Sequence, residues 1–180
     1  MSSETCKPYD AARTGVNLGE AAVAVYVSNL AKESSVLIAG DANINDANHI
    51  SGPSRTGEGL VLSIEKAMNE AQVNSENVDY ISAHGTATLF NDEMEAIAFN
   101  RTNLQTVPVN SLKGYFGHTL GASGLLESVL TIESLKQSVL VPSLGFETPG
   151  TSQPLNIITE KITKELNVAL KTASGFGGSN

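Results

Sequence analysis

The sequence of 180 residues contains no tryptophan, a single cysteine (Cys6) and only three histidines. One cysteine excludes a disulfide within the chain. Three histidines at unrelated spacings do not give the ligand pattern of a structural zinc site, so no metal or other cofactor is expected. Positive charge is also scarce, with 11 Lys and Arg against 19 Asp and Glu. Nucleic acid is therefore not an expected partner, because its recognition needs a clustered cationic surface.

Long apolar runs are missing as well. No stretch approaches the roughly 20 apolar residues of a membrane-spanning helix. The first residues, MSSETCKPYD, lack the apolar core of a signal peptide, so the expected location is the cytoplasm. Apolar residues make up 41% of the chain, which is ordinary for a globular protein, and the length suits a single domain.

Strands and helices are predicted to alternate along the chain. Apolar runs predict strands over 21–27, 35–39, 78–83, 107–109 and 166–173. Apolar residues at helical spacing predict helices over 55–71, 92–99 and 122–135, with loops over 41–53 and 142–154. This order is typical of an α/β layered domain with helices on both faces of its sheet.

The stretch 107–135 is the centre of the predicted functional site. A short strand there leads into a glycine-broken turn that carries Lys113 and His118 and opens a buried helix. His84 directly follows the strand predicted over 78–83. Because ligands of open α/β sheets bind at the carboxyl ends of the strands, the two histidines are expected to converge.

These residue types suit the stabilisation of a developing negative charge. A helix N-terminus disfavours the imidazolium form, so the histidines are expected to be neutral. Two neutral imidazoles directed at one point can stabilise an oxyanion or an enolate. Lys113 is expected to orient the pair, with Glu95 as an available counter-ion. Asp92 and Glu95 also have the spacing of a helix capping box, and that structural reading stays open.

Three further features have structural readings. His49 fits a structural hydrogen-bond donor better than a catalyst. Residues 175–178 resemble a dinucleotide-binding loop, but no helix or acidic partner follows them, so that interpretation is rejected. Cys6 has no positioned base nearby in the sequence and is a poor nucleophile candidate.

Four motifs occur in an order that a known family shares. They are Lys7-Pro-Tyr-Asp10 with Gly19-Glu20; His84-Gly-Thr-Ala-Thr88 with Asn91, Asp92 and Glu95; Lys113 with Gly117-His118 and Gly121-Ala122; and Gly175-Phe-Gly-Gly-Ser-Asn180. With these motifs the chain resembles, over essentially its whole length, the β-ketoacyl-[acyl-carrier-protein] synthases of fatty-acid and polyketide synthesis, of the synthase II type. The resemblance implies a thiolase-like layered fold with a mixed sheet, of which this chain would be the C-terminal half.

The family chemistry is a decarboxylative Claisen condensation. A malonyl thioester loses CO2, and the resulting enolate attacks an acyl group held on a cysteine. By position, the resemblance makes His84 and His118 the enolate-stabilising pair and Lys113 their support. The remaining roles implied by position are Glu95 as the ion-pair partner of Lys113, Phe176 with Gly175 and Gly177 as a gating loop, and Thr86, Thr88 and Asp92 as supporting residues.

The departures from the family matter for activity. The family nucleophile precedes the part that this chain resembles, and Cys6 matches a later position, so the isolated chain is expected to be inactive. Both ends of the 1–180 domain look truncated relative to the family. The first expected partners are acyl- and malonyl-carrier-protein thioesters, with Lys7 and Arg13 as candidate docking residues. The second expected partner is the missing half of the fold or a partner synthase subunit. Oligomerisation is expected through the face which that half would cover.

Two other functions stay open at this point. One is a non-catalytic subunit that resembles a chain-length factor and shapes the pocket of a complete synthase. The other is a free-standing acyl-thioester-binding module.

One smaller departure gives a geometric prediction. Some relatives hold a monovalent cation with a glutamate at the position of Glu127 and two polar residues before the glycine loop. Those two positions are Lys171 and Thr172 here. The ammonium of Lys171 is therefore predicted to lie beside Glu127 in place of the cation.

Overall fold

The computed structural model describes residues 1–46 and 54–180. Helices form at all three predicted places, as α1 (Glu58–Glu70), α2 (Leu89–Arg101) and α4 (Ser123–Gln137). Helix α2 is longer at both ends than the predicted 92–99. One turn of helix, α3 (Lys113–Phe116), precedes α4, and short 3-10 turns lie at η1 (Ser75–Asn77) and η2 (Leu120–Ala122).

The strands of the described residues lie in two sheets. The larger sheet has the order β4-β2-β1-β6, formed by Asn156–Ile157, Pro108–Asn110, Tyr80–Ser82 and Ala169–Lys171, and its pairs are parallel. The smaller sheet pairs β3 (Val139–Leu140) with β5 (Ile162–Thr163) in antiparallel orientation. The predicted α/β layered fold is confirmed, with the two strand orientations divided between separate sheets.

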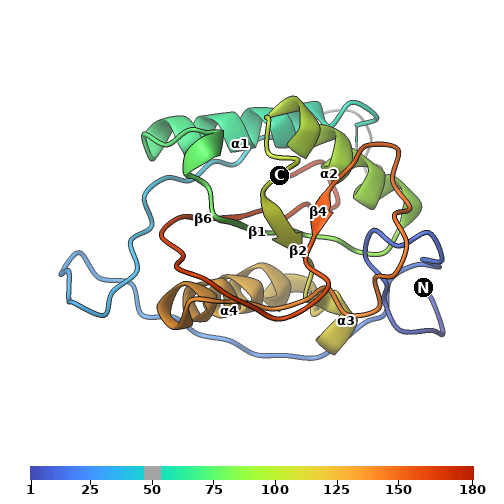
Figure 1. Cartoon of the computed structure of the whole chain (residues 1–180), viewed down its shortest axis with the longest axis horizontal. Coiled ribbons are helices and arrows are strands. Elements are labelled where there is room, and N and C mark those ends of the chain that lie inside the picture. Colours follow the sequence, from blue (N-terminus) through green and yellow to red (C-terminus); the bar gives the residue numbers. More distant parts are fainter. Residues whose placement is uncertain (47–53) are drawn as a thin grey trace.

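Helices cover both faces of the larger sheet (Figure 1). Helices α1 and α2 lie on one face, and α4 lies on the other. Along β1 the side chains alternate between these layers, as the pleat of a strand requires. Ile81 belongs to the core cluster that includes Leu60 of α1 and Phe99 of α2, whereas Tyr80 belongs to a second cluster with Leu140. Because β1 is buried on both faces, its carboxyl end is held firmly, and His84 follows it two residues later.

The strands predicted over 21–27 and 35–39 are not formed. These residues run extended along and beyond the body of the domain without sheet partners (Figure 1). Their large side chains are mostly exposed: Tyr26 91%, Val27 71%, Leu37 81% and Ile38 67%. An apolar run of strand character needs a neighbouring strand and a covering layer, and the described residues of this chain supply neither for this segment.

Residues 47–53 lie outside the described part of the chain. They include His49 and most of the loop predicted over 41–53, so the structural role of His49 stays a prediction. In the described part, none of the helices combines the length and the apolar character needed to span a membrane.

Candidate active site

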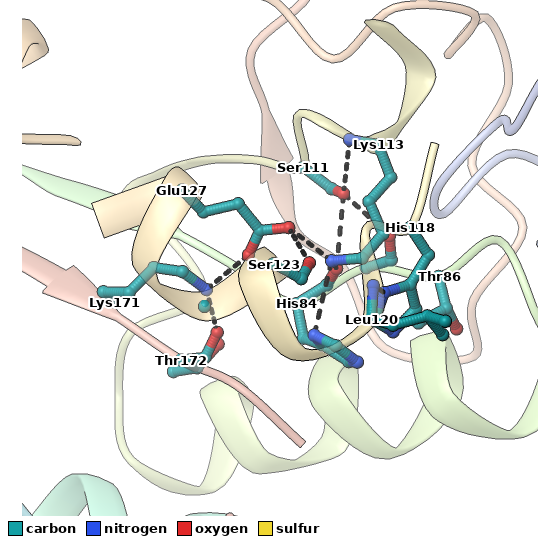
Figure 2. A network of polar contacts seen from close by, with 12 residues as sticks. His84, Thr86, Ser111, Lys113, His118, Leu120, Ser123, Glu127, Lys171 and Thr172 are labelled. Carbon is teal, nitrogen blue, oxygen red and sulfur yellow. Dashed lines mark hydrogen bonds and ion pairs between the residues drawn. The ribbon is translucent and has the colours of Figure 1, made fainter. Parts of the chain in front are cut away.

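The structure brings the two predicted histidines together (Figure 2). The ring centroids of His84 and His118 are 5.1 Å apart, and the rings meet edge to face at 83°. His84 is buried, with 5% of its surface exposed, and follows β1. His118 follows α3, and its main chain is held by residues 17–19: its N–H donates to Asn17 O (2.8 Å), and its carbonyl accepts from Gly19 N (3.0 Å). The predicted convergence of the two imidazoles is confirmed.

Lys113 lies directly behind His84. Its Nζ is 3.3 Å from Nδ1 of His84 and donates to the carbonyl oxygen of the same residue at 2.5 Å. An ammonium group can only donate, so Nδ1 of His84 is the acceptor in this contact. The neutral ring then carries its hydrogen on Nε2.

The ring of His118 is set to the same tautomer by the main chain. The N–H of Leu120 donates to Nδ1 of His118 at 3.1 Å. A main-chain N–H has no lone pair to offer, so Nδ1 must be unprotonated and Nε2 carries the hydrogen in the neutral ring. Both imidazoles therefore present a donor at Nε2.

Burial and nearby positive charge keep both rings neutral. Burial, followed by the ammonium groups of Lys113 and Lys171, holds the pKa of His84 well below its usual range. Partial burial and Lys113 also lower the pKa of His118, although Glu127 opposes the shift. At neutral pH each ring is thus an uncharged donor.

The ion-pair partner predicted for Lys113 is wrong. The ammonium of Lys113 contacts Glu127 Oε1 at 2.5 Å, and both side chains are fully buried. Glu127 lies on α4, where Ser123 one turn earlier also donates to Oε1 at 2.9 Å. A glutamate whose neighbours one turn away are serine and threonine (Ser123 and Thr131), on a helix that packs against the sheet, was the available signal for this partner.

Glu95, which was predicted to pair with Lys113, instead binds main-chain N–H groups. Its carboxylate accepts the main-chain N–H groups of His84 (2.8 Å) and Gly85 (2.7 Å), and also the hydroxyl of Tyr9 (2.9 Å). Because these donors use both oxygens, Glu95 fixes the turn after β1 instead of pairing with Lys113. Sequence reasoning missed Tyr9, which joins the N-terminal motif to this turn.

Asp92 supports the same turn, and the predicted capping box is absent. The N-cap of α2 is Thr88, which makes no side-chain capping bond. Asp92 accepts from the N–H groups of Tyr9 (2.8 Å) and Thr86 (3.0 Å), and its carboxylate lies 3.7 Å from Arg13 Nε. Burial raises the pKa of Asp92 to about 7. Thr86 and Thr88 share a hydroxyl hydrogen bond of 2.8 Å.

Arg13 is therefore not free to dock a carrier protein, contrary to expectation. Its side chain is buried beside Asp92 and donates to the carbonyls of Asp10 (2.9 Å) and Gly150 (2.6 Å). A guanidinium held in this way shapes the fold and contributes little to the surface potential.

The predicted contact of Lys171 is confirmed. Its Nζ lies 2.8 Å from Glu127 Oε2 and donates to the carbonyl of Thr172 (Figure 2). Lys171 enters from the end of β6, on the opposite side of Glu127 from Lys113. In residues 1–46 and 54–180 there is no group of three or more His, Cys, Asp and Glu side chains arranged to hold a metal ion.

The glycine loop lies against another segment of the chain. Gly178 O accepts from Asp46 N, and Asn180 O accepts from Ile44 N. Phe176, with Gly175 and Gly177 on either side, is 89% exposed. The gating role of this loop stays a prediction, because its described contacts are with residues 43–46 and not with the histidines.

Cys6 is buried and has the environment of an unreactive thiol. Its Sγ accepts from Asn17 N at 3.0 Å, and burial raises its pKa. A raised pKa reduces the thiolate fraction that a nucleophile needs.

Comparison with known proteins identifies the family of this chain. The family model for the beta-ketoacyl synthase C-terminal domain matches residues 35–147. A putative mitochondrial 3-oxoacyl-[acyl-carrier-protein] synthase of Schizosaccharomyces pombe is 34% identical over 97% of this chain and 44% of its own length. The chain thus spans less than half of that relative.

Solved structures show the same similarity. A type II polyketide synthase acyl-carrier protein in complex with its ketosynthase matches with a TM-score of 0.75 and 32% identity, over 79% of this chain and 36% of that one. A ketosynthase in complex with its chain length factor, from Xenorhabdus doucetiae, matches with a TM-score of 0.84 and 26% identity, over 99% and 45%. The chain therefore belongs to the beta-ketoacyl synthase family and corresponds to the C-terminal half of a ketosynthase.

Proposed function

We propose that this chain supplies the enolate-stabilising half of a 3-oxoacyl-[acyl-carrier-protein] synthase. The observation that carries the proposal is the pair of imidazoles with ring centroids 5.1 Å apart, one buried and one partly buried, with the Lys113 ammonium behind the buried one. Both rings are neutral donors at Nε2, which is the protonation state that stabilises an oxyanion without losing a proton.

In the proposed reaction the malonyl thioester carbonyl accepts from Nε2 of His84 and His118. The bond between the carboxylate and Cα breaks, CO2 leaves, and the electron pair moves onto the thioester oxygen as an enolate. The enolate carbon then attacks the carbonyl of an acyl thioester, and the acyl-carrying thiolate departs. Lys113 holds His84 in the donor tautomer throughout.

The thiol that carries the acyl group would come from outside these 180 residues. Cys6 is unsuited to that task because it is buried and its pKa is raised. The exposed apolar residues of segment 21–39 support the same conclusion, since they are of strand character and have no sheet to join. We propose that the first half of the fold, as part of the same polypeptide or as a partner subunit, covers this segment.

The partners follow from the same chemistry. Acyl- and malonyl-carrier-protein thioesters are the proposed substrates, and a relative of known structure is a ketosynthase bound to such a carrier. Fatty-acid and polyketide synthesis both use this condensation. The cytoplasmic location and an oligomeric assembly stay predictions.

A second candidate is a non-catalytic subunit that resembles a chain-length factor. A solved structure similar to this chain contains such a subunit beside its ketosynthase. The complete arrangement of His84, His118 and Lys113 favours the catalytic role, because a scaffold has no chemical need for two neutral imidazoles backed by a buried ammonium.

The test is reconstitution with acyl- and malonyl-carrier protein. The isolated chain is expected to give no 3-oxoacyl product, whereas its complex with a polypeptide that supplies the first half of a β-ketoacyl synthase fold is expected to give it. His84→Ala and His118→Ala should each slow malonyl decarboxylation by about 100-fold or more. The matched control is Lys136→Gln, an exposed residue of α4.

Two outcomes would overturn the proposal. Condensation by the isolated chain would remove the need for an outside nucleophile. A complex in which both histidine variants keep full condensation activity, but change the product length, would establish the chain-length-factor role instead.

A further inference from the structure

Glu127 lies between two lysines that come from different parts of the fold. Its Oε1 contacts Lys113 of α3 at 2.5 Å, and its Oε2 lies 2.8 Å from Lys171 of β6 (Figure 2). The side chains of Glu127 and Lys113 are fully buried, and that of Lys171 is 15% exposed. These three side chains therefore place two positive charges and one negative charge almost out of contact with water, and the next carboxylate, that of Glu95, lies at the main chain of His84.

Glu127 needs only one lysine to neutralise its charge, yet it contacts two. One buried ammonium is enough to pair one carboxylate, and enclosing another charge carries a desolvation cost. In the described part of the chain, Oε2 of Glu127 accepts no well-aligned hydrogen bond. Its interaction with Lys171 is therefore an ion pair. Without Lys171 this oxygen would be buried and unpaired.

The position of Glu127 controls the position of Lys113. With Oε2 held by Lys171, Oε1 is left to receive both Lys113 and Ser123. Lys113 in turn contacts Nδ1 of His84 at 3.3 Å. A carboxylate free to rotate would let the Lys113 ammonium move, and the tautomer of His84 would no longer be fixed.

Resting on the proposed function, we propose that Lys171 is the built-in cation of this site, a positioning residue that holds Glu127 and thereby fixes Lys113 on His84. Its charge also adds a positive contribution to the potential at the imidazoles, opposite in sign to that of Glu95 at the main chain of His84. A positive contribution favours the enolate oxygen over the uncharged thioester. Lys171 touches neither substrate nor reacting atoms.

The titration behaviour of the surrounding groups agrees with this geometry. Burial acts to raise the pKa of Glu127, yet the ammonium groups of Lys171 and Lys113 hold it below its usual range. Lys171 also contributes, after burial and Lys113, to the lowered pKa of His84. Neutralising Lys171 should therefore change the pKa of the His84 ring, which is three contacts away through Glu127 and Lys113.

The test compares Lys171→Met with Lys171→Arg and with the exposed control Lys136→Met. Imidazole resonances of the full chain are titrated by NMR, which requires no turnover. The pKa values of His84 and His118 should both rise in Lys171→Met. They should stay at their wild-type values in Lys171→Arg and Lys136→Met. Unchanged values in folded Lys171→Met, or an equal rise in Lys136→Met, would overturn the proposal.

A kinetic readout separates this inference from the function on which it rests. In the reconstituted complex Lys171→Met should lower kcat for malonyl decarboxylation roughly tenfold with KM nearly unchanged, and Lys171→Arg should restore it. If the wild-type complex is inactive, the proposed function fails while the histidine titration still decides the role of Lys171. If Lys171→Met does not fold, the Arg variant decides: a shift of its histidine pKa values despite the retained charge would contradict a charge-based role.

Removal of the ammonium should also create a place for a small cation. The space would be lined by Glu127 Oε2 and the carbonyl of Thr172, and oxygen ligands of this kind suit hard monovalent ions. KCl should therefore raise the melting temperature of Lys171→Ala more than choline chloride does, with equal effects of the two salts on wild type. Equal effects on the variant would show that Lys171 does not fill a cation position.

Discussion

The ammonium nitrogen of Lys113 lies 3.3 Å from Nδ1 of His84 and 2.5 Å from the carbonyl oxygen of the same residue. The lysine therefore holds both the ring and the main chain of one histidine. Because the ammonium cannot accept, the contact leaves the ring hydrogen on Nε2. The result is a neutral donor on the side of the ring that faces away from the lysine.

We predict that Gly19→Ala displaces His118. A Cβ at Gly19 would lie 1.8 Å from the carbonyl oxygen of Phe116, so the segment that bonds the main chain of His118 must move. The expected loss of unfolding free energy is about 2 kcal/mol or more, measured by urea denaturation, with a shift of the His118 resonances.

The matched control for this change is Gly121→Ala. A Cβ there meets no atom within 4 Å, and the residue lies in the helical turn before α4. It should leave stability unchanged or slightly higher. Equal stability of the two variants would contradict the close approach at Gly19.

We predict that Glu95→Gln destabilises the turn after β1. The amide would offer one acceptor oxygen where the carboxylate offers two, and its NH2 group would face main-chain donors. The unfolding free energy should fall by about 2–4 kcal/mol, whereas Glu133→Gln on the exposed face of α4 should change it by less than about 0.5 kcal/mol.

Glu95→Gln and a second variant, Glu127→Gln, together test which glutamate pairs with Lys113. If Glu127 is the partner, Glu127→Gln shifts the Lys113 ammonium resonance strongly, and Glu95→Gln shifts it little. The opposite ranking would restore the partner predicted from the sequence.

We predict that protonation of His84 lowers the stability of the fold as the pH drops below about 6.5. The pKa of His84 is lowered in the folded chain, so the unfolded chain binds the proton first. Protonation then favours unfolding, with a slope of at most about 1.4 kcal/mol per pH unit for one group. Above pH 7 this contribution is constant.

Urea denaturation of wild type and His84→Gln from pH 5 to pH 8 measures the difference. The variant should lose part of the slope below pH 6.5. Asp92, whose pKa is raised to about 7, contributes a slope of opposite sign in both proteins and cancels in the comparison. Identical slopes would show that His84 is not held neutral by the fold.

We predict that the isolated chain self-associates through segment 21–39. Its exposed apolar side chains favour contact with another copy when no other layer covers them. Tyr26→Lys combined with Leu37→Lys should reduce association, and Phe90→Lys, which replaces an exposed residue of α2, should not. Sedimentation velocity checks this, and a monomeric wild-type chain would refute it.

The chemical groups of the site and the main helices could be predicted from the amino-acid sequence. Two local patterns can be recognised whatever the arrangement of the layers. They are His84 after an apolar strand, and Lys113 with His118 before a buried helix. The helices were predictable for the same reason, because their apolar spacing is a property of a few consecutive turns. The contact of Lys171 with Glu127 was also predicted, but from family positions and not from the residues alone.

The partner of each group depends on contacts between elements that are far apart in the sequence, and these contacts are seen in the folded chain. Glu95 and Glu127 both lie on helices within reach of the site, and nothing in their spacing from Lys113 ranks them. The packing of α4 against β6 places Glu127 at the ammonium, while the turn after β1 occupies Glu95. The strands predicted over 21–27 and 35–39 failed for a related reason: a strand is stabilised by its neighbours in space, and a sequence pattern cannot say whether those neighbours are present.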